Sequence, residues 1–248
     1  EEMGVNLPGS KKGDRTDIEL PAVQRELIDA LHRAGKKIIL VNCSGSPIGL
    51  EPETQKCEAI LQAWYPGQQG GTAVAEVLFG DYNPAGKLPV TFYRNVSQLP
   101  DFEDYNMTGR TYRYMQDVPL FPFGYGLSYT TFGYGKTVLD KNELTAGQSL
   151  KLTVPVTNTG KRNGEEVVQV YLRKQGDAEG PIKTLRAFKR VSIPAGKTVN
   201  VEFDLKDKEL EWWDDQSNTV RVCPGSYDIM VGGSSKEEDL QRTTVAIK

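Results

Sequence analysis

The amino-acid sequence is poor in the side chains from which proteins build metal and redox sites. It has three cysteines and one histidine among 248 residues. Cys43, Cys57 and Cys223 are scattered without the CxxC spacing of a zinc or redox site, and His32 stands alone. We therefore expect no metal ion and no cofactor. We expect the cysteines to be reduced thiols that pack as small apolar groups.

An excess of one charge and long apolar runs are also missing. The 30 basic residues nearly balance the 33 acidic ones, which argues against a nucleic-acid or anionic-membrane partner. No apolar run reaches the length of a membrane span, and EEMGVNLPGSKKGDR at the start has neither the basic end nor the apolar stretch of a signal peptide. Because an initiator Met is also lacking, we expect a piece of a longer protein.

Short motifs for phosphate binding and serine hydrolysis are absent. PGQQGG at residues 66–71 is not GxGxxG, and no GK[ST] supplies a phosphate lysine. We interpret its glycines as permitting a tight turn and close helix packing. Ser44 and Ser46 do not lie in GxSxG, and His32 on a predicted surface helix does not support a Ser/His triad.

The first half of the chain alternates helical and strand patterns. LPAVQRELIDALHRAGKK predicts a helix that begins at Pro21 and ends near Gly35, with one apolar stripe formed by Val23, Leu27, Ile28, Leu31 and Ala34. Continuous apolar runs predict buried parallel strands at 38–43 and 59–65, and LPVTFY at 88–93 is a possible edge strand. The run TAVAEVLFG after PGQQGG predicts a second helix, so this half is α/β.

From about Lys136 the period changes to two, which is typical of half-buried strands. Alternating apolar residues predict strands over 150–156 and 198–205, and GEEVVQVYL, LRAFKRVSI, NTVRVC and SYDIMVG are further candidates. Pro155 has no N–H to donate, so we place its strand at a sheet edge or at a bulge. The spacing of the turns predicts a β-sandwich.

PLFPFGYGLSYTTF at residues 119–132 joins the two halves and is dense in rings. Its glycines and prolines bend the chain, while Phe121, Phe123, Tyr125, Tyr129 and Phe132 can each bury a large apolar area. The main interpretation is packing at the seam. An aromatic platform that stacks on sugars is the alternative.

Three longer strings resemble the C-terminal part of family 3 glycoside hydrolases of the β-xylosidase and β-glucosidase type. They are GDRTDIELPAVQRELIDAL, AILQAWYPGQQGGTAVAEVLFGDYNPAGKLPVTFY and GRTYRYMQDVPLFPFGYGLSYTTF. VPVTNTGKRNGEEVVQVYL, LRAFKRVSIPAGKT and PGSYDIMVGGSS are similar to the terminal fibronectin type III-like domain of the family. The resemblance implies part of an α/β sandwich with flavodoxin-like layers at 1–134, followed by a fibronectin type III-like β-sandwich at 135–248. It also implies secretion or a periplasmic location.

The resemblance further implies where the catalytic carboxylates belong. Family members carry an Asp nucleophile on an N-terminal (β/α)8 barrel, which this sequence lacks, and a Glu acid/base in a loop shortly before the Gly-Asp-Arg element. Retaining hydrolysis needs both carboxylates, about 5 to 5.5 Å apart. Glu1 or Glu2 is the candidate acid/base, although the catalytic Glu can also lie just upstream.

Two functions follow as hypotheses. The first is the C-terminal fragment of a retaining exo-acting β-glycosidase acting on oligosaccharides or aryl β-glycosides, inactive by itself; RTYRYM and AWYPGQ favour the xylosidase branch. The rival is a noncatalytic carbohydrate-binding or scaffolding module that uses Trp64, Tyr65, Trp212 and Trp213. With so few strands in the α/β half, we expect an uncovered face that binds the missing barrel and first strands, or a second copy of the chain.

Overall fold

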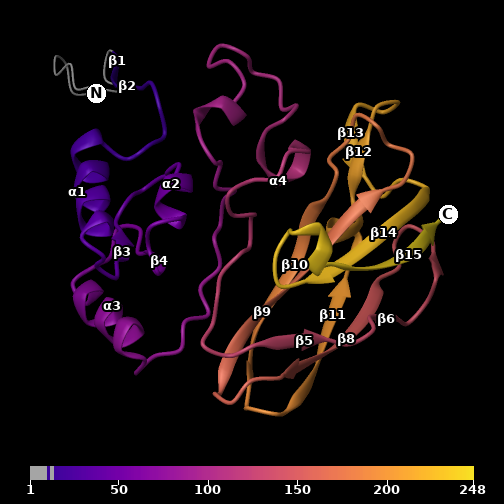
Figure 1. The fold of residues 1–248 in the computed structure, drawn as a ribbon. Helices are drawn as coiled ribbons and strands as arrows, with labels where there is room; N and C mark the ends of the chain where they lie inside the picture. Colours follow the sequence, from indigo (N-terminus) through magenta and orange to yellow (C-terminus); the bar gives the residue numbers. More distant parts are fainter. Residues whose placement is uncertain (1–9, 12–13) are drawn as a thin grey trace. The chain divides into compact units, whose positions relative to one another are not determined.

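The computed structural model describes residues 10–11 and 14–248 (Figure 1). The chain forms two compact units. The first comprises the chain up to Tyr82 together with 90–110 and 116–121, and the second comprises 83–89, 111–115 and 122–248. No helix among the described residues is long and apolar enough to cross a membrane.

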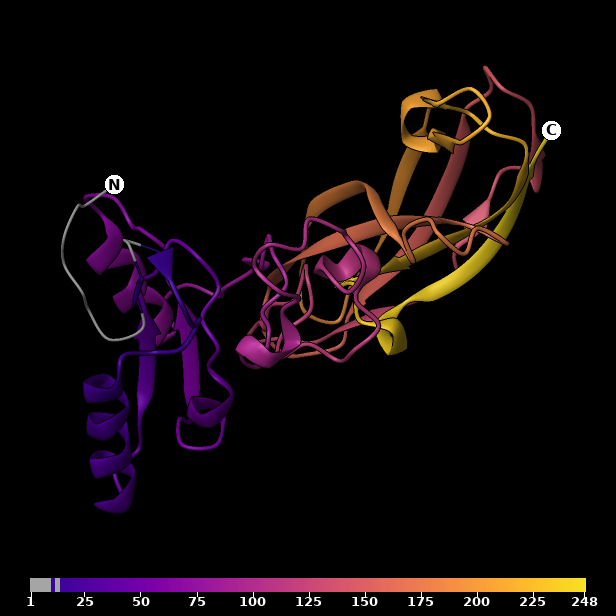
Figure 2. The same ribbon diagram turned by 90° about the horizontal axis from the view of Figure 1, so that it is seen from above.

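The first unit is built on a parallel pair of strands, β3 (Ile39–Asn42) and β4 (Ala59–Gln62), in which Ile39 pairs with Ala59 and Asn42 with Gln62. Helix α1 (Ala22–Arg33) runs beside this pair in both views, and α2 (Glu51–Thr54) lies between the two strands in the sequence (Figures 1 and 2). Helix α3 (Gly70–Phe79) follows β4 through the predicted glycine loop. A short hairpin of β1 (Ser10–Lys11) and β2 (Asp14–Arg15) precedes them. The predicted α/β class is confirmed.

Helix α1 begins and ends where the sequence predicts. Pro21 directly precedes its first residue, where a missing N–H costs no helical hydrogen bond. Gly35 follows the helix with φ +66°, a left-handed conformation that glycine adopts without strain, and its N–H donates to the His32 carbonyl at 2.9 Å. His32 is exposed, as predicted.

The predicted burial of this unit is wrong in part. Of the predicted stripe only Ile28 is buried, whereas Val23 is 71% exposed and Leu27 61%. Ile39 of the predicted buried strand β3 is 52% exposed. A parallel strand is buried when neighbours and helices cover it, and among the described residues β3 and β4 pair only with each other.

Segment 88–93 is not an edge strand. Its only ladder contact is an isolated antiparallel bridge between Phe92 and Phe121. Pro89 removes one donor, and the neighbouring Leu88 N–H instead bonds the Tyr125 carbonyl at 2.8 Å. The stretch therefore runs beside the ring-rich segment rather than in a sheet.

The second unit is the predicted β-sandwich of two sheets. One sheet has the strand order β10-β9-β14-β15-β7, and the other has β11-β8-β5 with β6 also pairing to β8. Its strands are β5 (Phe132–Tyr134), β6 (Val138–Leu139), β7 (Glu143–Leu144), β8 (Leu150–Asn158), β9 (Gly164–Lys174), β10 (Thr184–Ile193), β11 (Thr198–Leu205), β14 (Gly225–Gly232) and β15 (Gln241–Ile247). A separate hairpin is formed by β12 (Trp212–Asp214) and β13 (Thr219–Arg221). Short helices α4 (Thr111–Tyr114) and α5 (Asp207–Leu210) and the 3-10 turns η1 (Val96–Gln98) and η2 (Glu237–Asp239) complete the chain.

The core of the sandwich follows the period of two. Leu150, Leu152, Val154 and Val156 on β8 are fully buried while the residues between them face outward. Val201, Phe203 and Leu205 on β11 do the same. Strand pairing aligns the two sets, since Val154 lies opposite Val201 and Leu152 opposite Phe203. The alternation that predicted these strands is thus the alternation that builds the core.

Pro155 does not mark a sheet edge, because β8 has partners on both sides. Strand β5 pairs with Val156–Asn158 of β8, and β6 pairs with Leu152 and Thr153. Pro155 lies opposite the break between them, where its carbonyl accepts from Gly135 N–H at 2.7 Å. Proline has no N–H to donate, and at Pro155 this missing donor falls opposite a gap in the neighbouring strand.

The cysteines do not all pack as predicted. All three are free thiols, but only Cys223 is buried, while Cys57 is half-buried and Cys43 is exposed. Cys43 directly follows β3, where the chain turns into the Ser/Gly loop.

Candidate functional site

The predicted acid/base residues cannot be placed. Glu1 and Glu2 lie outside the described residues, so their assignment stays a prediction. Among the described residues there is no group of three His, Cys, Asp or Glu side chains placed to hold a metal ion. The structure does define the edge of the first unit at which strands β3 and β4 end.

The carboxyl ends of parallel strands are the edge at which α/β proteins bind ligands. There Asn42 Nδ2 donates to Gln62 Oε1 at 2.6 Å and to Ser44 Oγ at 3.0 Å, while the Ser44 hydroxyl donates to the Ser46 carbonyl at 2.8 Å. The hydroxyl of Ser44 is thus engaged with a backbone oxygen and has no imidazole partner. It is a loop-bracing group, as the missing GxSxG motif predicts.

Two rings follow β4 at this edge. Trp64 has φ +56°, a left-handed backbone conformation that residues other than glycine rarely adopt. Its ring meets that of Phe92 edge to face, with the ring centroids 6.1 Å apart. Tyr65 is 80% exposed and lies over Gly45, where an added Cβ would come 2.4 Å from its ring. Strained backbone is concentrated at ligand sites. Both rings were named from the sequence for the rival module, but the strain at Trp64 and the need for glycine at Gly45 were not predicted.

An ion cluster around the buried Glu53 connects α1 to α2 and to the loop before α2. Arg25 Nε donates to Glu53 Oε1 at 2.9 Å, and its Nη2 donates to the Gly49 carbonyl at 3.1 Å. Glu53 is fully buried. Arg25 also pairs with Glu19. Every partner is a group of the unit itself, so the cluster holds the helix in place and does not form an open acid/base pair.

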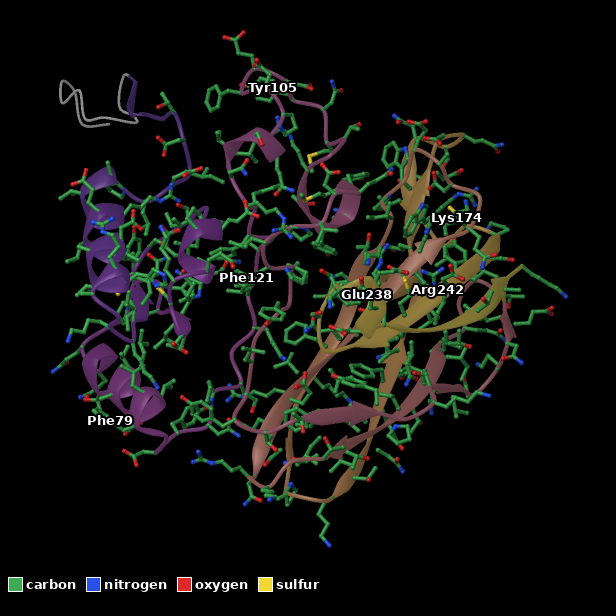
Figure 3. The ribbon with its side chains drawn as sticks, in the orientation of Figure 1. Phe79, Tyr105, Phe121, Lys174, Glu238 and Arg242 are labelled. Atoms are coloured by element: carbon green, nitrogen blue, oxygen red, sulfur yellow. The ribbon has the colours of Figure 1, made fainter. Side chains whose placement is uncertain are left out.

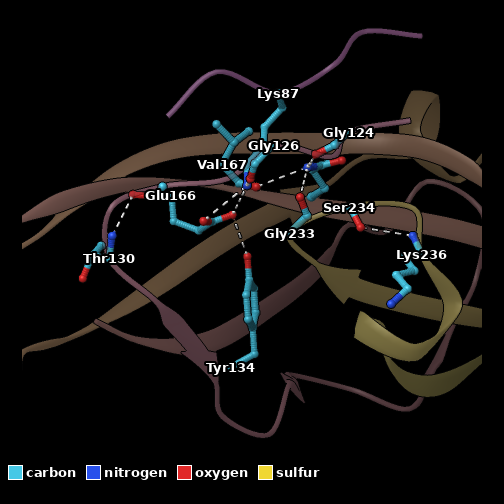
Figure 4. Close-up of polar contacts among 12 residues, drawn as sticks. Lys87, Gly124, Gly126, Thr130, Tyr134, Glu166, Val167, Gly233, Ser234 and Lys236 are labelled. Atoms are coloured by element: carbon cyan, nitrogen blue, oxygen red, sulfur yellow. Dashed lines mark hydrogen bonds and ion pairs between the residues drawn. The ribbon is translucent and has the colours of Figure 1, made fainter. Parts of the chain in front are cut away.

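A second buried carboxylate lies in the sandwich unit (Figure 4). Glu166 on β9 accepts from Lys87 Nζ, 3.1 Å from Oε1, and from the Tyr134 hydroxyl at 3.2 Å. Burial raises the pKa of Glu166, against the opposing effect of Lys87, and raises the pKa of Tyr134.

A carboxyl with a raised pKa resembles a general acid. However, the Glu166 side chain is only 6% exposed and its partners surround it. Nearby, Gln169 Nε2 bonds the carbonyls of Gly124 and Gly233 at 3.1 and 2.6 Å. We interpret the Glu166 carboxylate and the Gln169 side-chain amide as anchors that hold the 83–89 and 122–126 segments on the sandwich. Neither was predicted from the sequence.

The adjacent tryptophans of the rival hypothesis differ in burial, so Trp212 is not available to stack on a sugar and Trp213 is. Trp212 is 2% exposed and its Nε1 donates to Asp177 at 2.6 Å, whereas Trp213 is 49% exposed. Rings of the ring-rich segment also pack within their own units. Phe121 meets Phe92 edge to face at 6.2 Å, and Phe123 stacks on Tyr112 at 4.2 Å.

Comparison with known proteins identifies the class. Residues 3–129 match the Glycosyl hydrolase family 3 C-terminal domain, and residues 166–235 match the Fibronectin type III-like domain. The chain is thus built as the C-terminal part of a glycoside hydrolase. It belongs to glycosyl hydrolase family 3.

Individual relatives agree with this family. The chain is 58% identical, over its whole length, to a xylan 1,4-beta-xylosidase of Xylanibacter ruminicola, of which it covers 28%. It is similar to the structure of a β-glucosidase from Erythrobacter marinus, with TM-score 0.83, 41% identity, 95% of this chain and 31% of that one. It is also similar to a mutant β-glucosidase from Listeria innocua in complex with laminaribiose, with TM-score 0.82, 31% identity, 97% of this chain and 34% of that one. These relatives favour the enzyme over the noncatalytic module.

Proposed function

We propose that the chain is the C-terminal part of a retaining exo-acting β-glycosidase that removes terminal β-linked sugars from oligosaccharides, with β-xylosides preferred. The observation that carries the proposal is the 58% identity, along the whole chain, to a xylan 1,4-beta-xylosidase. The chain spans only 28% of that relative. The activity therefore belongs to the longer protein.

Retaining hydrolysis proceeds in two steps. A carboxylate attacks the anomeric carbon to form a glycosyl-enzyme, while a carboxylic acid protonates the leaving oxygen; the same group then deprotonates the attacking water. We assign the acid/base role to Glu1 or Glu2 and the nucleophile to the barrel implied by the family resemblance. In this proposal the α/β part, 1–134, supplies one wall of the active site, and the sandwich, 135–248, braces the assembly.

The uncovered face of the first unit supports the assignment to a longer protein. Val23, Leu27 and Leu31 form one exposed side of α1, and Phe79 at the end of α3 is 84% exposed and points outward (Figure 3). Isolated apolar residues on a surface are ordinary, but a continuous stripe calls for a partner. We propose that the N-terminal part of the enzyme covers this stripe.

The test compares the 248-residue chain with the longer protein on p-nitrophenyl β-xyloside and β-glucoside. We expect no turnover by the chain, because one carboxylate cannot complete the two-step reaction. The longer protein should hydrolyse both substrates, with the larger kcat/KM on the xyloside. Hydrolysis by the chain alone, or none by the longer protein, would reject the proposal.

A further inference from the structure

The sandwich unit contains a cavity of about 460 Å³ that the proposed function does not use. Its wall is formed by three segments of this unit: α4, the loop between β9 and β10 together with the first residues of β10, and the β12–β13 hairpin with the residue before it. These segments are far apart in the sequence. The volume is within the range of small-molecule sites.

The hairpin supplies an aromatic wall. Because strand side chains alternate, Trp212 and Trp213 face opposite ways, and the structure buries the first and leaves the second half exposed. Trp213 Nε1 donates to Asp215 Oδ1 at 2.8 Å, which fixes the indole in place. Tyr114 contributes a second ring to the wall. A fixed, exposed indole beside a cavity is a surface on which an apolar sugar face can stack.

The polar lining combines donors and acceptors that the fold leaves unused. The guanidinium of Arg113 makes no hydrogen bond or ion pair with any described residue. The carboxylates of Glu179 and Glu211 likewise have no hydrogen-bond partner in the described part of the chain. Arg186 uses one Nη on the Glu211 carbonyl, while its buried Nε has no partner.

Packing accounts for some of these groups but not for all. Arg186 lies 5.7 Å from the Trp212 ring centroid, and Asp177 binds both the Trp212 indole and the Gly180 N–H. These contacts explain why the loop and the hairpin stay together. They do not explain two arginines on one wall, where burial and the charge of Arg113 lower the pKa of Arg186.

The backbone before Arg113 is strained as well. Thr111 has φ +56°, and a β-branched residue in the left-handed region is a true outlier. Strain of this kind persists at ligand sites when the surrounding structure maintains it. The strained backbone at Thr111 and the two like-charged side chains of Arg113 and Arg186 therefore lie at one wall of the cavity.

The charges of the lining select the class of ligand. Four carboxylates, from Asp177, Glu179, Glu211 and Asp215, surround two guanidinium groups, so the cavity is net negative and disfavours an anion. A small cation would be repelled by the two guanidinium groups. A ligand with many hydroxyls can donate to the carboxylates, accept from the arginines and stack on Trp213. We propose that this cavity of the fibronectin type III-like part binds a neutral oligosaccharide, with Trp213 as the stacking platform and Arg113 as its principal donor.

Such a site goes beyond the proposed hydrolysis, although the choice of sugar probes rests on that function. Binding in this cavity needs neither Glu1 nor Glu2. Titration of the inactive chain therefore tests the cavity separately from the activity of the longer protein. If the longer protein fails to hydrolyse glycosides while the titration succeeds, only the proposed function is rejected.

The experiment is calorimetric titration of the 248-residue chain with xylohexaose and cellohexaose, with inorganic sulfate and a trigalacturonate as anionic comparators. We expect a Kd of about 1 mM or tighter for a neutral oligosaccharide. Trp213→Ala should weaken binding about tenfold, because the stacking area is lost. Trp213→Phe should retain most of the affinity, and Arg113→Gln should weaken binding several-fold.

The matched control is Phe188→Ala, which removes another exposed ring, 65% exposed, from the same unit but not from the cavity. It should bind like the unchanged chain. Circular dichroism confirms that each variant is folded. Absence of binding, equal affinity in Trp213→Ala, an equal loss in Phe188→Ala, or tighter binding of the anions would each overturn the proposal.

Discussion

Lys87 Nζ lies 3.1 Å from Glu166 Oε1, although the two residues are 79 positions apart in the chain. The Lys87 side chain is 14% exposed and that of Glu166 6%, so the pair is nearly removed from water. Lys87 also donates to the Gly126 carbonyl at 3.0 Å. The Lys87 ammonium group thus links its own segment, 83–89, to the ring-rich segment and to strand β9.

Removing one partner of this pair should be costly. Lys87→Met leaves the Glu166 carboxylate buried without its cation, and we expect the free energy of unfolding of the sandwich to fall by about 3 kcal/mol. Urea denaturation followed by tryptophan fluorescence measures the change. The matched control is Lys248→Met in the exposed pair with Glu143, which should change stability by less than about 1 kcal/mol.

The double variant Lys87→Met, Glu166→Leu distinguishes the destabilisation caused by an unpaired buried charge from that caused by lost packing of the lysine stem. With both charges removed, no charge is left buried alone, and most of the stability should return. A double variant as unstable as Lys87→Met would show that packing of the lysine stem, and not the unpaired charge, carries the effect.

The raised pKa of Glu166 gives stability a specific pH dependence. Burial raises this pKa above its ordinary value of 4.5, so between the two values the folded state holds a proton that the unfolded state has released. The contribution of Glu166 is therefore fully present below pH 4.5 and is lost as the pH rises through the folded-state pKa. Comparing urea midpoints of the chain and of Glu166→Gln from about pH 4 to about pH 8 should show this decline only in the former. A steeper decline in Glu166→Gln would contradict the assignment.

Much of the sandwich could be predicted because local pattern and tertiary burial agree there. The alternation along β8 and β11 decides which side chains face the core, and each sheet supplies the other's cover. Strands with weaker patterns were not predicted: β15 reads QRTTVAI, and β5, β6 and β7 have two or three residues each. Their pairing depends on distant strands and not on their own residues.

Predictions failed where the answer depends on partners distant in sequence. The stripe of α1 was predicted correctly as a stripe, but its exposure follows from the absence of a covering layer among the described residues. The Lys87–Glu166 pair and the unpaired Arg113 have no local signal, because lysine, glutamate and arginine are ordinary surface residues. Only the fold brings them to enclosed positions.

The exposed stripe should make the isolated chain associate. Leu27 is 61% exposed, so Leu27→Glu should cost little folding stability while it disrupts an apolar contact surface. We expect sedimentation to show self-association of the chain that Leu27→Glu reduces, and binding of the separately expressed N-terminal part that the same variant weakens. Val138→Glu, at a site 58% exposed in the sandwich, is the control and should change neither. A compact monomer that binds no hydrophobic dye and no N-terminal part would refute this role of the stripe.

Glu1 and Glu2 are the two candidates for the acid/base. In the longer protein, Glu1→Gln and Glu2→Gln are each assayed on a xylo-oligosaccharide and on an activated aryl β-xyloside. At the catalytic position, loss of the proton donor should slow the oligosaccharide by about 100-fold to about 10,000-fold, because its poor leaving group must be protonated. The aryl glycoside should lose far less in the glycosylation step, since an activated phenolate departs without a proton. The other glutamate is the internal control, because its substitution should leave both rates nearly unchanged. Equal losses on the two substrates in either variant, or none in both, would move the acid/base upstream of Glu1 and leave the chain with the wall of the active site but none of its catalytic carboxylates.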